Sequence, residues 1–160
     1  EEELEAVDNY IYILNVRFAG DIHFSKKVEC DVENVRVPSM ILQPVVENAV
    51  NHGIRNIDWE GHIDLSVEKW NDHIEISVRD NGLGMTGEQI QRVLSKKVHS
   101  SSGEGDSTGI GMNNVISRLE LYYERDGLME IYSEGEGMGT EVVINIPLER
   151  SEKNVQNPDC

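Results

Sequence analysis

The chain has only two cysteines, Cys30 and Cys160, among its 160 residues. Two cysteines cannot form the disulfide framework of a small secreted protein, and no Cys-x-x-Cys pair or His/Cys cluster indicates a zinc site. We therefore expect a protein of a reducing, cytosolic compartment. A chain of this length can bury one hydrophobic core, so a single globular domain is the expected organisation.

Basic residues are also scarce, because 14 Lys and Arg stand against 30 Asp and Glu, for a net charge of −16. An acidic surface repels the phosphates of nucleic acids and the headgroups of anionic lipids. We expect no direct binding of nucleic acid. An anionic ligand would need locally placed hydrogen-bond donors or a divalent cation.

Long hydrophobic runs are absent too. No apolar stretch approaches the roughly 20 residues of a membrane-spanning helix, and no signal-peptide pattern is present. The chain begins with Glu1 rather than Met, inside a helical pattern. We expect it to be part of a longer protein, in which a membrane anchor would lie upstream.

What the sequence does contain is clear hydrophobic periodicity, which predicts helices interleaved with about five strands. Ser39 is a suitable N-cap, Thr86 with Gln89 forms a capping box, and Gly53 is a suitable helix stop. The pattern predicts an α+β fold, a two-layer α/β sandwich with a mixed sheet. The predicted helices span residues 1–18, 39–53, 86–94 and 110–125, and the predicted strands span residues 22–30, 35–37, 63–67, 74–78, 128–133 and 140–146.

The first helix has apolar residues at steps of three and four, which form an a/d seam. These residues are Leu4, Val7, Ile11, Leu14 and Phe18. The seam is equally consistent with a helix packed on its own domain and with the end of a coiled coil that pairs with a second subunit. Two heptads do not decide between them.

The helix predicted for residues 39–53 has two chemically distinct faces. At 100° per residue, one arc holds Leu42, Val45, Val46, Ala49 and Val50, and the opposite arc holds Glu47, Asn48, Asn51 and His52. A solvated polar face is the ordinary explanation of such a split. Two amides and an imidazole are unusual surface residues, however, so we also consider a binding role.

Asp80 ends a predicted strand and opens the segment Asp-Asn-Gly-Leu-Gly-Met. A carboxylate there offers only hydrogen-bond acceptors, and Gly82 and Gly84 let the backbone approach a ligand closely. The stretch Gly82–Gly87 also matches Gly-x-Gly-x-x-Gly, the dinucleotide fingerprint. We disfavour that interpretation because the acidic residue expected some 20 positions later falls in a Ser/Gly-rich loop instead of at a strand end.

A second glycine segment, Thr-Gly-Ile-Gly-Met at residues 108–112, runs into a predicted helix. Backbone N–H groups at a helix start bind phosphate oxygens. The preceding residues 96–107 are rich in Ser, Gly and Lys and have no periodicity, as expected of a mobile lid. Lys96 and Lys97 are weak candidates for phosphate contacts, since exposed loop lysines are usually solvated.

Taken together, these segments and Gly139–Pro147 resemble the Bergerat-type ATP-binding domain, most closely that of LytS/YesM-like sensor histidine kinases. The continuation Asn114-Val-Ile-Ser-Arg-Leu is close to the family's GIGLxNVxxRL pattern. The resemblance implies ATP and Mg²⁺ as cofactors. It covers nearly the whole chain from Glu1 to Leu148.

The resemblance also implies roles for individual residues. Asn48 would ligate Mg²⁺, and Asn51 and His52 would face the phosphates. Asp80, joined by Thr140, would accept a hydrogen bond from the exocyclic amino group of adenine, which guanine cannot donate. The remaining implied ATP contacts are Gly82, Gly84, Met85, Thr108, Gly109, Ile110, Gly111 and Met112.

Pro44 departs from the hydrolytic members of the superfamily. Topoisomerases, Hsp90-like chaperones and mismatch-repair ATPases have a water-activating glutamate four residues before the magnesium asparagine, where this chain has Pro44. Phosphoryl transfer to a histidine needs no activated water, because the imidazole is the nucleophile. Glu47 is a weak candidate for an assisting role, and no catalytic residue is assigned.

Further expectations follow from the resemblance. We predict the end of a helical dimerisation and phosphoacceptor region at residues 1–18, the ATP-binding domain at 19–148 and a disordered tail at 149–160. His23-Phe24 lacks the family's acceptor context, so the phosphoacceptor is expected upstream. Expected partners are the chain's own dimerisation domain, the receiver domain of a response regulator and, in the full protein, a second copy. The expected location is the cytoplasmic side of a membrane-anchored bacterial protein.

Two other functions remain as alternatives. One is an ATP-hydrolysing conformational clamp of the topoisomerase or chaperone type, disfavoured by Pro44. The other is an interaction module that has lost nucleotide binding, disfavoured by the intact Asn48, Asp80 and glycine segments.

Overall fold

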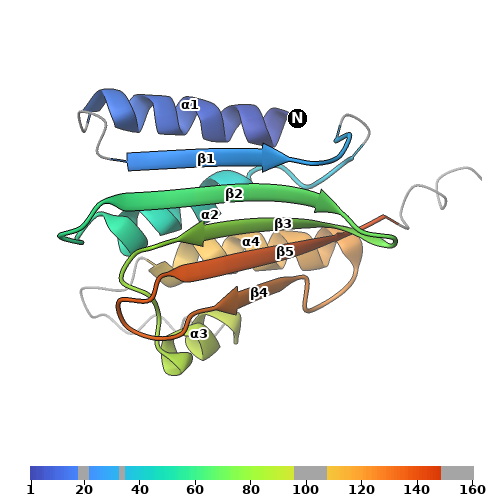
Figure 1. Ribbon diagram of the computed structural model, residues 1–160. Helices are drawn as coiled ribbons and strands as arrows, with labels where there is room; N and C mark the ends of the chain where they lie inside the picture. The colour runs from blue at the N-terminus through green and yellow to red at the C-terminus, as the bar shows by residue number, and fades with distance from the viewer. Residues whose placement is uncertain (18–21, 33–34, 96–107, 149–160) are drawn as a thin grey trace, which may run out of the picture.

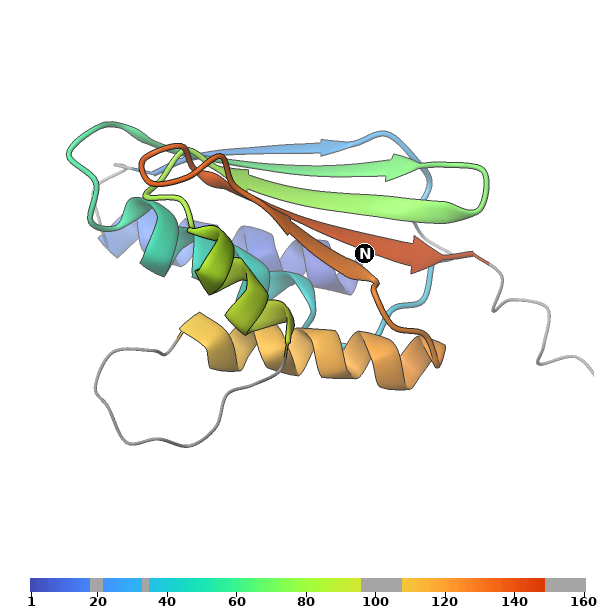
Figure 2. The ribbon, with the colours of Figure 1, turned by 90° about the horizontal axis from the view of Figure 1, so that it is seen from below.

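The computed structural model describes residues 1–17, 22–32, 35–95 and 108–148. The helices pack on one face of a single sheet and leave its other face open (Figures 1 and 2). This arrangement confirms the predicted α+β two-layer fold with a mixed sheet. In chain order the elements are α1 (Glu2–Arg17), β1 (Ile22–Val28), α2 (Leu42–Asn48), the π-helix η1 (Ala49–Ile54), β2 (Gly61–Lys69), β3 (His73–Asp80), α3 (Gly87–Leu94), α4 (Thr108–Tyr123), β4 (Met129–Tyr132) and β5 (Thr140–Pro147).

The five strands lie in the order β1-β2-β3-β5-β4. Strand β1 runs parallel to β2, and the other neighbours are antiparallel. Alternation along β2 explains the two faces: Ile63, Leu65 and Val67 are buried under the helices, whereas His62 and Asp64 are exposed on the open face. In the central β3–β5 pair, Asp80 lies opposite Thr140, so the ends of the two strands that carry these predicted site residues meet at one edge of the domain.

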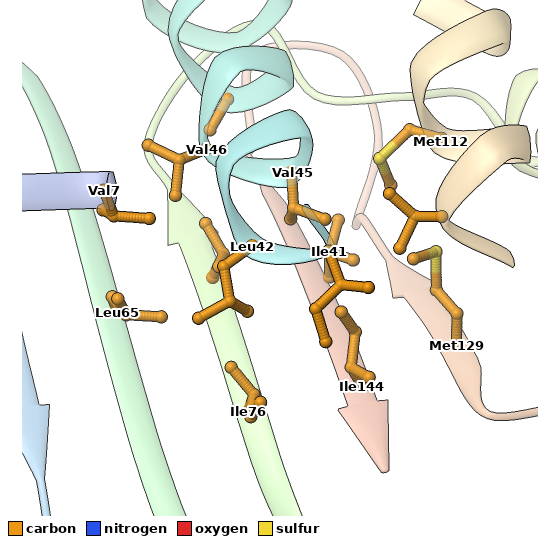
Figure 3. Close-up of a cluster of buried hydrophobic side chains, with 14 of the residues drawn as sticks. Val7, Ile41, Leu42, Val45, Val46, Leu65, Ile76, Met112, Met129 and Ile144 are labelled. Atoms are coloured by element: carbon orange, nitrogen blue, oxygen red, sulfur yellow. The ribbon is translucent and has the colours of Figure 1, made fainter. Parts of the chain in front are cut away.

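The core lies between the sheet and the helices, with α2 near its centre (Figure 3). The apolar arc predicted for residues 39–53 is confirmed, because its five members are at most 3 % exposed. Burial of this face turns the polar residues of α2 and η1 to the opposite side of the helix. The cluster in Figure 3 combines residues of α1, α2, α4 and the sheet, among them Val7, Leu42, Val45, Met112, Leu65 and Ile144.

Helix α1 packs on the chain's own domain. Val7 and Ile11 of the predicted seam are buried, and Leu4 and Leu14 pack partly against the core. On the other side of the helix, Tyr12, Ile13 and Val16 are exposed. Packing of the seam on its own domain is thus the arrangement observed. The assignment of residues 1–18 to a dimerisation region is a separate claim and stays a prediction.

Two local predictions before α2, the strand at 35–37 and the Ser39 cap, are wrong. The segment 35–37 forms no strand; Val35 and Val37 are apolar because they pack against the core, and the carbonyl of Arg36 accepts a hydrogen bond from Tyr123. The helix begins at Leu42 without a side-chain cap from its own segment. Pro44 is therefore in the first turn, where its missing N–H costs nothing.

Gly53 does not stop the helix, because the chain continues as the π-helix η1 to Ile54. Elsewhere the predicted capping box of Thr86 and Gln89 is confirmed at the start of α3. The predicted lid (96–107) and tail (149–160) lie outside the described residues. Among the described helices, none combines the length and apolar character that crossing a membrane requires.

Candidate functional site

The site is centred on Asp80, the last residue of β3, whose side chain is only 7 % exposed. The carboxylate accepts a hydrogen bond from the backbone N–H of Gly82, with 2.9 Å between N and Oδ1. The π-helix η1 lies directly against it: a Cβ added to Gly53 would stand 2.7 Å from Asp80 Oδ1. Asp80 is therefore surrounded by backbone, and Gly53 is required by this close approach and not by a helix stop.

Burial changes the acid–base behaviour of this group. Loss of water around the carboxylate raises the pKa of Asp80 to about 6, while hydrogen bonds from the backbone at Gly82 and Thr140 oppose the rise. Burial disfavours the charged form, and the amides partly replace the lost hydration. A buried carboxylate with unfilled acceptor capacity suits a ligand that brings N–H donors.

Glycines make this packing possible on two further sides. Gly82 lies so close to η1 that a Cβ would overlap the carbonyl group of Gly53, and Leu83 donates its N–H to that same carbonyl at 2.9 Å. Gly139, at φ +73°, lies against the carbonyl oxygen of Asp80 and donates its N–H to Gly82 at 3.1 Å. A side chain at either glycine would force the segments apart.

A clasp between two loops was not predicted from the sequence. Ser133 Oγ accepts the N–H of Met85 at 3.0 Å and donates to the carbonyl of Gly139 at 2.6 Å. Gly137 donates to the carbonyl of Leu83 at 2.7 Å. The β4–β5 turn thereby holds the Gly82–Met85 loop in place. The alternating glycines at 135, 137 and 139 are the signal that could have revealed it.

Asn81 forms a second, equally unpredicted fastening, to the start of β2. Its side chain accepts the N–H of His62 at 2.8 Å and donates to the carbonyl of Glu60 at 2.9 Å. The indole N–H of Trp59 donates to the Asn81 carbonyl, also at 2.9 Å. The residues that follow Asp80 are thus tied to neighbouring segments, which helps to fix the direction of its carboxylate.

The polar face of α2 and η1 contains the other predicted site residues. Asn48 and His52 are half-buried, and Asn51 is exposed and accepts a hydrogen bond from Arg55 at 3.4 Å. Glu47 accepts a hydrogen bond from Gln43 at 2.8 Å, so its carboxylate is engaged one turn back. π-Helical turns are frequent at functional sites. This one brings Gly53 against Asp80 and so joins the polar face to the buried carboxylate.

The glycine segment 108–112 forms the beginning of α4, instead of a turn before it. The first amides of a 16-residue helix have no partner within the helix, which makes them suitable for phosphate oxygens. The Met112 side chain is 2 % exposed and part of the core, so only its backbone can face a ligand. The side chains of residues 108–110 lie outside the described part of the chain.

The other histidines and the two loop lysines lie apart from this cluster or outside the described residues. His23 is on β1, where it stacks on His62 and pairs with Glu60 at 2.5 Å. His73 lies beside Trp70 and Asp72 at the β2–β3 turn. Lys96, Lys97 and His99 fall outside the described residues.

Comparison with known proteins identifies this arrangement. Residues 36–150 match the family described as "Histidine kinase-, DNA gyrase B-, and HSP90-like ATPase". The chain belongs to this family. Among curated relatives, it is 28% identical to the sensor protein LytS of Staphylococcus saprophyticus over 161 residues and 31% identical to the sensor histidine kinase YpdA of Escherichia coli over 158 residues. These matches confirm the predicted resemblance.

The alignments cover 100% and 94% of this chain but only 26% and 25% of the two relatives. The chain thus spans about a quarter of their length. Among solved structures, the catalytic domain of histidine kinase ThkA aligns with a TM-score of 0.63 at 19% identity, covering 91% of this chain and 94% of that one. At that identity the likeness concerns the fold.

The contact between Gly82 and Gly53 generates a first prediction. Gly82→Ala should lower the free energy of unfolding by about 2 kcal/mol or more, because the new Cβ meets backbone that has no room to move. Gly87→Ala is the matched control, since nothing lies within 4 Å of its Cβ, and it should be neutral or slightly stabilising. Urea unfolding of both variants gives the comparison. Equal urea midpoints for the two variants would contradict the close packing of Gly82 on Gly53.

The raised pKa of Asp80 predicts a pH-dependent cost. The unfolded carboxyl ionises near pH 3.8 and the folded one near pH 6, so the domain loses stability as the pH rises across that window. Asp80→Asn keeps the acceptor for Gly82 and removes this cost. In nucleotide-free protein, its stability advantage over wild type should be about 1 kcal/mol larger at pH 8 than at pH 5.

Denaturant unfolding at the two pH values measures this difference. Asp58→Asn, at an exposed position, serves as the control, and its stability difference from wild type should be the same at both pH values. An Asp80→Asn advantage that is the same at both pH values would show that burial does not shift this carboxyl.

Proposed function

We propose that this chain is the ATP-binding catalytic portion of a two-component sensor histidine kinase, which delivers the γ-phosphoryl group of Mg·ATP to a histidine outside these 160 residues and thence to a response regulator. The family membership supports ATP binding. The single observation that carries the proposal is the buried Asp80 carboxylate, enclosed by the backbones of Gly53, Gly82 and Gly139.

The residues present fit an adenine base. The glycines let backbone, and not side chains, surround Asp80, and the carboxylate lies at the end of β3 opposite Thr140, itself 7 % exposed. Adenine presents an exocyclic amino group to such an acceptor. Guanine presents a carbonyl at the same place, which would leave a buried charge facing an oxygen.

The phosphates would extend from the base towards the helices. Asn48, Asn51 and His52 line the polar face of α2 and η1, and the backbone of residues 108–112 supplies amides at the start of α4. Among the described residues there is no group of three or more His, Cys, Asp or Glu side chains suited to a metal ion. Mg²⁺ would therefore be held by Asn48 together with the phosphates and water, as is usual for this ion.

The rival function is an ATP-driven clamp that hydrolyses its nucleotide. Pro44, in the first turn of α2, stands four residues before Asn48, where hydrolytic relatives have their water-activating glutamate. Proline has no group that accepts a proton, and Glu47 is engaged with Gln43. We infer transfer to a protein histidine instead of to water.

The acceptor histidine is proposed to lie outside this chain. His23 is the second residue of the edge strand β1 and pairs with Glu60, which is not the setting of the family's acceptor helix. The helical dimerisation region, the second copy in the full protein, the receiver-domain partner and the membrane anchor remain proposals supported by the LytS-type relatives.

Nucleotide selectivity tests the assigned base contact. Wild type should bind Mg·ATP and Mg·ADP much more tightly than Mg·GTP, because Asp80 offers only acceptors. Asp80→Asn should weaken ATP binding by about 1.5–3 kcal/mol through loss of a charge-assisted hydrogen bond. Isothermal titration calorimetry measures both effects. Equal affinity of wild type for ATP and GTP would refute the assignment of Asp80.

Incubation with γ-labelled ATP tests the fate of the phosphoryl group. The chain alone should release phosphate at a negligible rate and take up no stable label, because absence of a positioned general base typically costs 10²–10⁴-fold in rate. Adding the upstream helical region, fused or separate, should produce labelled histidine on that region. Rapid phosphate release by the 160-residue chain would favour the clamp, and label on His23 or His52 would contradict an external acceptor.

A further inference from the structure

The α2 N-terminal segment, residues Ser39–Leu42, is held by two oppositely charged side chains from other helices. From α1, the Glu3 carboxylate accepts the backbone N–H groups of Met40, Ile41 and Leu42, at 2.6, 2.8 and 3.0 Å. These are the free amides at the start of α2, where a negative charge is also favoured by the helix dipole. Glu3 thus replaces the cap that the sequence predicted for Ser39.

From α4, the guanidinium of Arg118 donates to the carbonyls of Ser39 and Met40, at 2.8 and 3.4 Å. One turn further along α4, the Tyr123 hydroxyl donates to the carbonyl of Arg36 at 3.0 Å. Arg118 is the arginine of the Asn-Val-x-x-Arg-Leu sequence, for which no role has been assigned above. Its guanidinium binds the carbonyl side of the same short segment whose amides bind Glu3.

The backbone of this segment would not hold its shape unaided. Met40 has φ +58°, a left-handed conformation that non-glycine residues seldom adopt because it is strained. Its side chain is 53% exposed, so burial of that side chain does not explain the conformation. The hydrogen bonds from Glu3 and Arg118, with buried Ile41 and Leu42 beside them, stabilise it.

The position of this segment decides where the phosphate-facing groups lie. Helix α2 ends at Asn48 and continues into η1 with Asn51 and His52, and α4 begins with the glycine segment 108–112. Helix α1 packs directly against α2, and burial, followed by the Glu47 carboxylate, raises the pKa of Tyr10 on α1. The adenine-facing groups, by contrast, belong to β3 and β5, which the sheet hydrogen bonds fix independently.

We propose that Glu3 and Arg118 are positioning residues for the phosphate and Mg²⁺ side of the nucleotide site, acting by setting α2 relative to α4 through the segment Ser39–Leu42. This inference rests on the proposed function. It also gives α1 a definite effect on the site: a displacement of α1 would move Glu3 and change the binding of phosphates while leaving the base contact in place.

The test compares Mg·ATP with adenosine, which has no phosphates. Glu3→Gln and Arg118→Gln should each weaken Mg·ATP binding by about fivefold, as expected for loss of roughly 1 kcal/mol of alignment, and leave adenosine binding unchanged. Glu5→Gln and Arg36→Gln are the matched controls, at exposed positions of α1 and of the connection before α2. They should change the binding of neither ligand. Asn48→Ala, which removes the proposed Mg²⁺ ligand, should show the same pattern more strongly.

Calorimetric titration with and without Mg²⁺, together with urea unfolding of every variant, separates the outcomes. The double variant of Glu3→Gln and Arg118→Gln should weaken Mg·ATP binding by less than the product of the two single fold-changes, because both residues act on one segment. If Mg·ATP and adenosine binding weakened equally, and by an amount that a smaller folded fraction accounts for, the residues would have a purely structural role and the inference would be overturned. Variants that bind like their controls would overturn it as well. Failure of wild type to bind Mg·ATP would instead refute the proposed function.

Discussion

The structure around the site depends on the burial of one carboxylate by backbone atoms. Asp80 is enclosed by a π-helix, a loop and a turn that approach it closely because they have glycine where a side chain would collide. Backbone amides replace only part of the lost hydration, which is why the pKa of this group rises to about 6. The domain therefore keeps an unfavourable group in its interior, and the large apolar core under α2 has to supply the compensating stability.

Sequence reasoning succeeded where the determinants were local or periodic. The alternation along β2 and β3, the apolar arc of α2 and the capping box of Thr86 each depend on residues within a few positions of one another, and each is observed. The two-layer fold follows from their order. Asp80 and the glycine segments were also found from the sequence, because a carboxylate and glycines at element ends form a local pattern.

The predictions that failed involve contacts between distant parts of the chain. Ser39 was a reasonable N-cap, but Glu3 reaches the α2 amides from another helix and the local signal is overruled. Gly53 was interpreted as a stop because its true neighbour, Asp80, is 27 positions later. The hydrogen bonds of the Ser133 clasp were not predicted for the same reason, since they join distant parts of the chain. Helix periodicity likewise could not show whether the α1 seam packs on its own domain or on a second subunit, since either packing requires the same apolar stripe.

The division of the site between the two layers has a physical consequence. The residues proposed to contact the base belong to a sheet in which each strand is fixed by a ladder of backbone hydrogen bonds. The residues proposed to contact the phosphates belong to helices that meet the sheet through apolar side chains, which are non-directional contacts and tolerate small displacements. Helices can therefore move relative to the sheet at lower cost than strands relative to one another. Under the proposed function, recognition of adenine belongs to the rigid layer. Control of phosphate geometry belongs to the helical layer, where α1, α2 and α4 are joined through polar contacts at a short segment.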